Sequence, residues 1–111
     1  MVDNKINVSS FEEKLKDCDV DVRYRLQYIM ESLNDTSDEI LDLIYKIEAL
    51  KVELVLLEEF GLVPPNTSKD ENENKIKDKI EEYETLIEYL QEREEALQDY
   101  FDEEYFRIMQ D

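Results

Sequence analysis

The sequence contains no His and no Trp, and only one Gly, one Cys and two Pro among its 111 residues. Without His, it lacks the Ser–His and Cys–His pairs that activate nucleophiles, and also the Glu-x-x-His pattern of di-iron helical bundles. One Gly cannot form the Gly-rich loop that cradles a phosphate group, and one Cys excludes both an internal disulfide and a Cys-based zinc site. We therefore expect no catalytic activity, no cofactor and no metal site.

Turn-forming residues are also too scarce for a fold built from many short β-strands, which needs a turn about every ten residues. Apolar residues make up 41% of the chain and recur at intervals of three and four positions, which is the period of an amphipathic helix. The composition therefore predicts an all-α protein. We expect an antiparallel three-helix bundle with a long C-terminal helix, forming a single domain over residues 10–111 after a flexible N-terminus at residues 1–9.

Three helices are predicted, at about residues 10–33, 37–60 and 70–109. Ser10 and Glu13 fit a capping box at the start of the first helix, and the acids on both sides of Cys18 favour a break there. The second helix is expected to end near Gly61, because Gly tolerates the left-handed cap and the two prolines that follow block a return to helix.

The boundary between the first two helices is open to two interpretations. The sequence NDTSD at residues 34–38 is typical of a turn, because its short polar side chains compete for nearby backbone groups. Against a turn, one set of positions keeps a seven-residue repeat across this sequence. This set, which we call the seam, consists of Leu26, Ile29, Leu33, Thr36, Ile40, Leu43, Ile47, Leu50, Leu54 and Leu57. A continuous helix would give a long two-helix coiled-coil hairpin that dimerises.

The second helix carries another apolar set on the side nearly opposite the seam. This set, the outer stripe, consists of Leu41, Tyr45, Ala49, Val52 and Leu56. A helix that is apolar on two sides must be covered on both. A turn at residues 34–38 would let the first helix cover one side. Without that turn, a second copy of the chain is expected to cover it.

The third helix loses apolar character toward its C-terminus. Glu94 and Glu104 place carboxylates at positions where its own repeat calls for apolar side chains. Some forty residues of helix, about 60 Å, also exceed the length of the two shorter predicted helices. We therefore expect a C-terminal overhang, or a place where another molecule joins.

Negative charge dominates the third helix. The whole chain has a net charge of −18, so phosphates would be repelled, and we expect a basic protein surface as partner with no direct binding to nucleic acid or membrane. Acids three and four residues apart share one helix face, and two aromatic side chains near the end of that face are candidate anchors. The predicted partner-binding residues are Glu84, Glu88, Glu92, Glu95, Asp99, Asp102, Glu103, Tyr105 and Phe106.

The favoured function is a non-catalytic acidic module that inhibits a nucleic-acid-binding protein or nuclease by occupying its phosphate groove. In composition the chain resembles small acidic phage proteins that mimic DNA, including some inhibitors of CRISPR nucleases, and this resemblance implies an anti-defence role. Two alternatives stay open. One is a coiled-coil scaffold or oligomerisation subunit. The other is a magnesium-dependent nucleotide pyrophosphatase, which would use helix-face pairs such as Glu81 with Glu84.

The cellular setting follows from two further absences. The opening MVDNKINVSS lacks the apolar core of a signal peptide, and no run of about 18 apolar residues is present to span a membrane. With a single Cys and no disulfide framework, the expected location is the cytoplasm.

Overall fold

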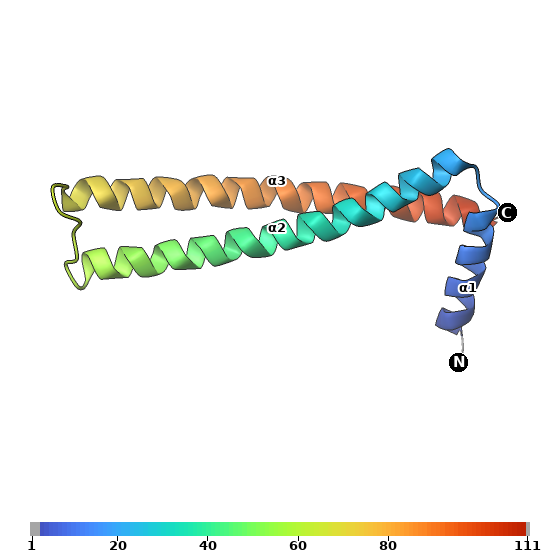
Figure 1. Cartoon of the computed structure of the whole chain (residues 1–111), viewed down its shortest axis with the longest axis horizontal. Coiled ribbons are helices and arrows are strands. Elements are labelled where there is room, and N and C mark those ends of the chain that lie inside the picture. The colour runs from blue at the N-terminus through green and yellow to red at the C-terminus, as the bar shows by residue number, and fades with distance from the viewer. Residues whose placement is uncertain (1–2, 111) are drawn as a thin grey trace. The chain divides into compact units, whose positions relative to one another are not determined.

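The computed structural model describes the backbone of residues 3–110 and the side chains of residues 10–110. It contains three α-helices and, over those residues, no strand: α1 (Asp3–Lys16), α2 (Val20–Glu58) and α3 (Lys69–Gln110) (Figure 1). The predicted all-α fold is therefore confirmed. None of the helices in the described part of the chain is apolar enough along its length to cross a membrane.

The first helix begins and ends differently from its prediction. It starts at Asp3, so Ser10 lies inside the helix and the predicted start at a Ser10 capping box is wrong. It stops at Lys16, where the amides of Asp17 and Cys18 donate to the carbonyls of Lys14 and Leu15 at 3.2 and 3.1 Å. The predicted break beside Cys18 is confirmed, while the flexibility of residues 1–9 stays a prediction.

The second helix runs through the sequence NDTSD without interruption, so the predicted turn at Asn34–Asp38 is wrong. The seam explains why the helix continues. Thr36 takes a seam position and is only 4% exposed, and Ile40, one turn later, is also buried. Burying this face favours the helix over a local cap. The other four residues of the segment are exposed, so the helix leaves their polar side chains in contact with water.

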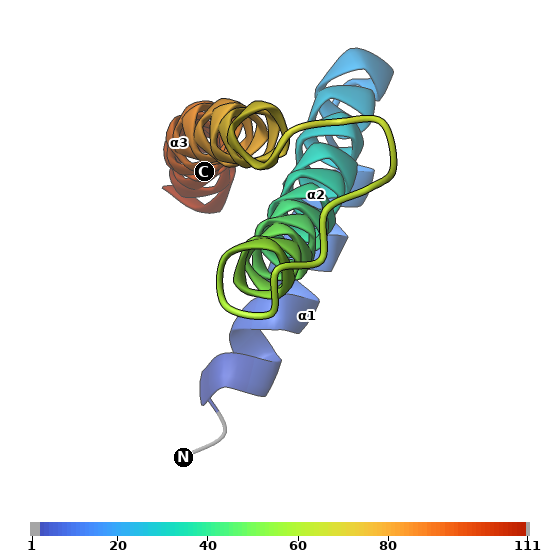
Figure 2. The same ribbon diagram turned by 90° about the vertical axis from the view of Figure 1, so that its left-hand side faces the viewer.

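A ten-residue loop joins α2 to α3 and faces the viewer in Figure 2. Gly61 and Asn66 both have φ of 64°, a left-handed conformation that Gly adopts freely and Asn tolerates. Ser68 then caps α3, because its Oγ accepts the amide of Glu71 at 3.1 Å. These residues end one helix and begin the next, close to the predicted boundaries.

The chain forms two compact units. One, the two-helix unit, is Ser37–Glu92, where the second part of α2 and the first part of α3 run antiparallel. The other, the three-helix unit, combines the residues up to Thr36 with those from Arg93 onward. The single-domain organisation stays a prediction.

The core of the two-helix unit comes from the seam of α2. Ile40 and Leu43 are buried against Leu90 of α3, with Tyr83 and Ile87 packed beside them. These α3 side chains recur at three- and four-residue steps, so each helix presents one apolar face to the other. The heptad pattern therefore predicts the contact correctly.

In the three-helix unit, the end of α3 is covered, so the predicted C-terminal overhang is wrong. Phe11 of α1 lies 4.8 Å from Tyr105 and 6.2 Å from Phe101, measured between ring centroids. Lys14 Nζ donates to the carbonyl of Met109 at 3.1 Å. The break between α1 and α2 frees α1 to pack on α3, which supplies the cover that the sequence pattern did not indicate.

Candidate functional site

All nine predicted partner-binding residues lie on α3. Glu84, Glu88 and Glu92 belong to the two-helix unit, and the others to the three-helix unit. All seven carboxylates are exposed, because the apolar positions of α3 face α2 and leave the remaining positions to solvent. We call these seven residues the acidic face: Glu84, Glu88, Glu92, Glu95, Asp99, Asp102 and Glu103.

Seven of the chain's basic residues pair with acids outside the acidic face. Lys46, Lys51, Lys75, Lys77, Lys79, Arg25 and Arg107 all form ion pairs, and over residues 10–110 none of these pairs involves the acidic face. Asp102 instead accepts a hydrogen bond from Gln98 Nε2 at 2.9 Å. The acidic face therefore presents carboxylates that this part of the chain leaves unneutralised.

Arg93 is the single base between residues 81 and 103, and its charge is directed elsewhere. Two hydrogen bonds lower the pKa of Tyr28 on α2: the one with Ser32 has the larger effect, and the one with Arg93 the smaller. Arg93 interacts with Tyr28, and over residues 10–110 it forms no ion pair with the acidic face. The ten acids in the same stretch of α3 consequently set its potential.

The two aromatic candidates differ in their surroundings. Tyr105 is half-buried and packs against both Phe11 and Phe101, with its ring 6.3 Å from that of Phe101. Phe106, the next residue, is 63% exposed. Phe106 therefore offers a larger apolar contact to a partner, whereas much of the Tyr105 ring already stabilises the three-helix unit.

A buried carboxylate lies in the three-helix unit at Glu104, where the sequence pattern showed only a gap in the apolar repeat. Its side chain is 4% exposed and forms ion pairs with both Arg25 and Arg107. The hydrogen bond from Arg25 also raises the pKa of that guanidinium. An acid at an apolar position of α3 was the only indication of this pair in the sequence. Its partner could not be predicted, because Arg25 lies 79 residues away.

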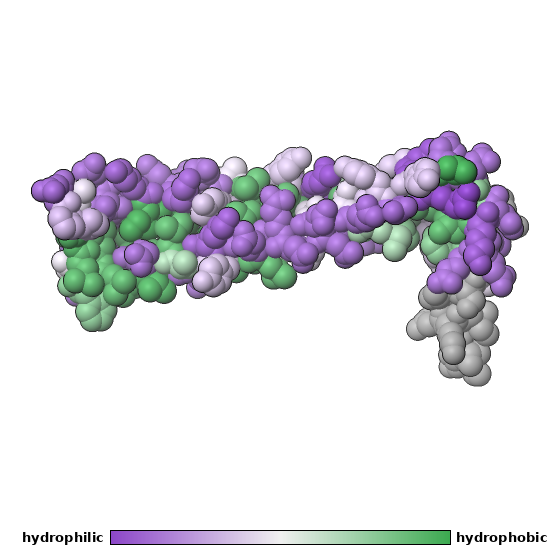
Figure 3. Space-filling model, in the orientation of Figure 1, coloured by the Kyte–Doolittle hydropathy of each residue, from purple (hydrophilic) through white to green (hydrophobic). Residues whose placement is uncertain are grey.

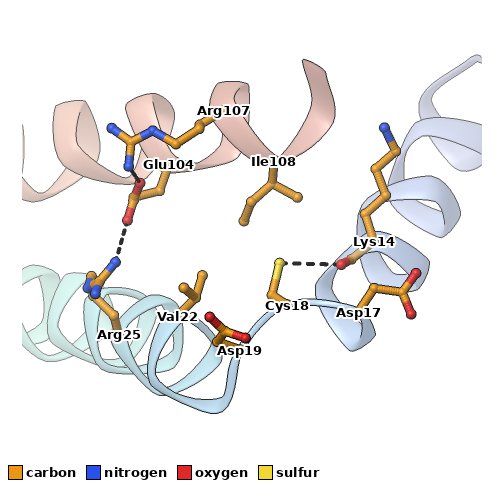
Figure 4. A pocket seen from close by; sticks show the side chains of 9 residues that line it. All are labelled: Lys14, Asp17, Cys18, Asp19, Val22, Arg25, Glu104, Arg107 and Ile108. Carbon is orange, nitrogen blue, oxygen red and sulfur yellow. Dashed lines mark hydrogen bonds and ion pairs between the residues drawn. The ribbon is translucent and has the colours of Figure 1, made fainter. Parts of the chain in front are cut away.

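The same carboxylate borders a cavity of about 520 Å³ beside the α1–α2 break (Figure 4). The cavity is lined by Lys14, Asp17, Cys18, Asp19, Val22, Arg25, Glu104, Arg107 and Ile108. Three bases face three acids, so the lining carries no net charge. Cys18 donates through Sγ to the carbonyl of Lys14 at 3.3 Å.

A pair of carboxyl groups connects the ends of the two helices in the two-helix unit. A hydrogen bond between Glu58 and Glu73 raises the pKa of Glu58 and lowers that of Glu73. Lys77 Nζ lies 3.9 Å from Glu58 and 3.5 Å from Glu73, and partly offsets the repulsion between them. We therefore expect the stability of the contact between these helix ends to depend on pH in the acidic range.

Glu81 and Glu84, the pair named for magnesium-dependent hydrolysis, are both exposed on α3. Among the residues described, no three acidic or Cys side chains gather as a metal site would require. Turnover with magnesium, lost when both residues become Gln, stays a prediction of that alternative.

No protein-family model, no curated protein and no solved structure matches this chain. Its function is therefore inferred from the exposed carboxylates of α3 and from the charge balance around them.

Proposed function

We propose that the chain is a non-catalytic binding module whose acidic face docks on a basic surface of another protein. One observation carries the proposal: the seven carboxylates are exposed, and across residues 10–110 none forms an ion pair with a Lys or Arg of the chain. Neighbouring like charges on a helix cost a few tenths of a kcal/mol per pair, roughly. A partner that brings its own cations relieves this repulsion and gains attraction from it.

The partner class that fits best is a protein with a groove for nucleic acid. Steps of three and four residues place a carboxylate about every 5–6 Å along a helix, and a DNA strand carries a phosphate about every 3.4 Å. Glu81 is also exposed on this side of α3 and raises the charge density further. By occupying such a groove, the module would inhibit the partner, as a phage-type DNA mimic in the cytoplasm does.

Pull-down from host lysate at low salt tests this proposal. The wild-type chain should retain nucleic-acid-binding proteins, and duplex DNA should release them, because DNA and the acidic face compete for one groove. A variant with Gln or Asn at all seven positions should lose this capture. Proteins that stay bound in excess DNA, or that bind the neutralised variant equally well, would contradict the proposal.

A matched control separates the acidic face from net charge alone. It neutralises seven other exposed acids, namely Glu31, Asp35, Asp38, Glu39, Glu53, Glu59 and Asp78. Both variants change the net charge by the same amount. Capture that survives in the control and fails in the acidic-face variant assigns binding to the acidic face.

A second function, as a coiled-coil scaffold or oligomerisation subunit, is favoured by a separate observation. Four of the five residues of the outer stripe are exposed, with Leu41 at 62%, Tyr45 at 73% and Val52 at 57%, and Leu56 is half-buried. Several exposed apolar side chains along one helix face are unusual and indicate a contact surface.

A further inference from the structure

The two-helix unit exposes a continuous apolar surface along α2. Besides the outer stripe, Ile44 is 45% and Val55 40% exposed on the same stretch of helix. Phe60 and Leu62 extend the surface into the loop, at 69% and 62% exposure. In Figure 3 the hydrophobic colour gathers over α2 toward the end that carries this loop.

The outer stripe itself is close to electrically neutral, and Glu58 and Glu59 follow it next to the loop. Between Leu41 and Leu56 there are three acids and two lysines. Two of those acids are neutralised locally, because Lys46 pairs with Asp42 at 3.0 Å and Lys51 pairs with Glu48 at 3.0 Å. A second copy, which repels the first elsewhere through its own charge of −18, meets little repulsion here.

We propose that the outer stripe is the interface of a homodimer, in which α2 of one copy packs antiparallel on α2 of another. Seven apolar side chains of α2 and the loop are 40–73% exposed. At about 100 Å² each, they offer about 700 Å² per copy, close to the roughly 800 Å² that each partner contributes to a specific interface. A two-fold symmetric contact uses the same surface on both copies and closes without further assembly.

Ala49 marks where the two helices cross. It is the small residue at the centre of the outer stripe, with Leu41 and Tyr45 on one side and Val52 and Leu56 on the other. A small side chain lets two helices approach closely. In the antiparallel arrangement, Leu41 and Tyr45 of each copy meet Leu56 and Val52 of its partner, so large side chains pack on both sides of the crossing.

Mass measurement by light scattering across concentration tests the dimer. The wild-type chain should show twice the chain mass, and Tyr45→Gln with Val52→Gln should halve that mass without loss of helix content. The matched control is Tyr24→Gln with Val20→Gln, which replaces the same residue types at 67% and 54% exposure outside the stripe. The control should stay dimeric. A monomeric wild type, a larger assembly or a dimeric stripe variant would overturn the proposal.

Salt separates this interface from the acidic face. Screening weakens repulsion between two copies, so the dimer should persist or tighten as salt increases, whereas binding of a basic partner should weaken. A dimer that dissociates at high salt would overturn the apolar interface and leave the proposed function of the acidic face standing.

Cross-linking tests the crossing point. In a Cys18→Ser background, Ala49→Cys should form a disulfide between two copies, because a crossing there brings the two β-carbons within bonding range. Asp78→Cys, exposed on α3 of the same unit, serves as the control and should stay reduced. Equal cross-linking at both positions, or none at residue 49, would overturn the antiparallel crossing.

Discussion

Arg25 Nη1 donates to Glu104 Oε1 at 2.7 Å and joins α2 to α3 inside the three-helix unit. The carboxylate is buried, and Arg107 on the next turn of α3 binds its second oxygen. A charge so placed is stable only because both of its oxygens have cationic partners. We therefore expect Glu104 to help set the register of α3 against α2.

Replacing Glu104 with Ala should destabilise the three-helix unit. The substitution removes a buried group that two arginines hold, so the free energy of unfolding should fall by about 2–4 kcal/mol. Chemical denaturation followed by circular dichroism measures the change. Glu103→Ala is the control: that side chain is exposed and its loss should change stability by less than about 0.5 kcal/mol. Equal effects at the two positions would contradict the structural role of Glu104.

Leu90 should be a main contributor to the core of the two-helix unit. It is 5% exposed and packs with Ile40 and Leu43 of α2, so Leu90→Ala should cost about 2–5 kcal/mol. Leu86, one turn earlier on α3, is 37% exposed and should lose much less when changed to Ala. Thermal and denaturant melts of both variants provide the comparison. A similar loss for both would mean that α2 and α3 do not pack through Leu90.

The Glu58–Glu73 pair should make stability depend on pH. Because their hydrogen bond raises the pKa of Glu58 in the folded state, stability is gained as the pH falls through that raised value. Gln resembles protonated Glu, so Glu58→Gln should raise the melting temperature at neutral pH. That advantage should disappear in acid, where the wild-type Glu58 is itself protonated.

Glu73 acts in the opposite direction. Its lowered pKa stabilises the folded state above the ordinary pKa of Glu, and this contribution is lost as the pH falls through the lowered value. Melting curves of the wild type and of Glu58→Gln at neutral and acidic pH separate the two effects. Glu59→Gln, next in the sequence and exposed, should behave like the wild type throughout. If Glu58→Gln raised the melting temperature equally at neutral and acidic pH, the raised pKa of Glu58 would be contradicted.

Partner binding through the acidic face should weaken steeply with salt, because exposed charges are screened beyond about 10 Å at 0.1 M. Titration of the captured partner across a salt series measures the slope. The variant neutralised at all seven positions should bind more weakly and with a flatter slope. A wild-type affinity that does not change from low to high salt would argue that contacts other than charge hold the complex.

Periodicity predicted the all-α fold, the third helix and the contact at the seam, but it misplaced the boundary between the first two helices. The five polar residues at Asn34–Asp38 favour a turn locally, but Thr36 keeps the seam in phase and the buried face outweighs the local preference. The cover of α3 by Phe11 depends on a contact between opposite ends of the chain, which no local pattern contains.

The candidate site divides in the same way. Exposure of the acidic face follows from the apolar positions of α3, so it could be predicted from the sequence alone. The partial burial of Tyr105 could not, because it depends on where α1 packs. Glu104 resembled a defect in the repeat for the same reason, since its partner Arg25 is distant in sequence.

Both long helices pass from one compact unit into the other without a break. Neither unit can therefore be exchanged between proteins by a single cut, since any junction severs two helices at once. The length of the two helices is easier to change than one of the units is to exchange. Seven extra residues in α2 after Thr36, matched by seven in α3 before Arg93, would keep every apolar position in phase. Evolution or design could lengthen this protein in whole heptads, whereas other insertions would rotate one half of each helix away from its contacts.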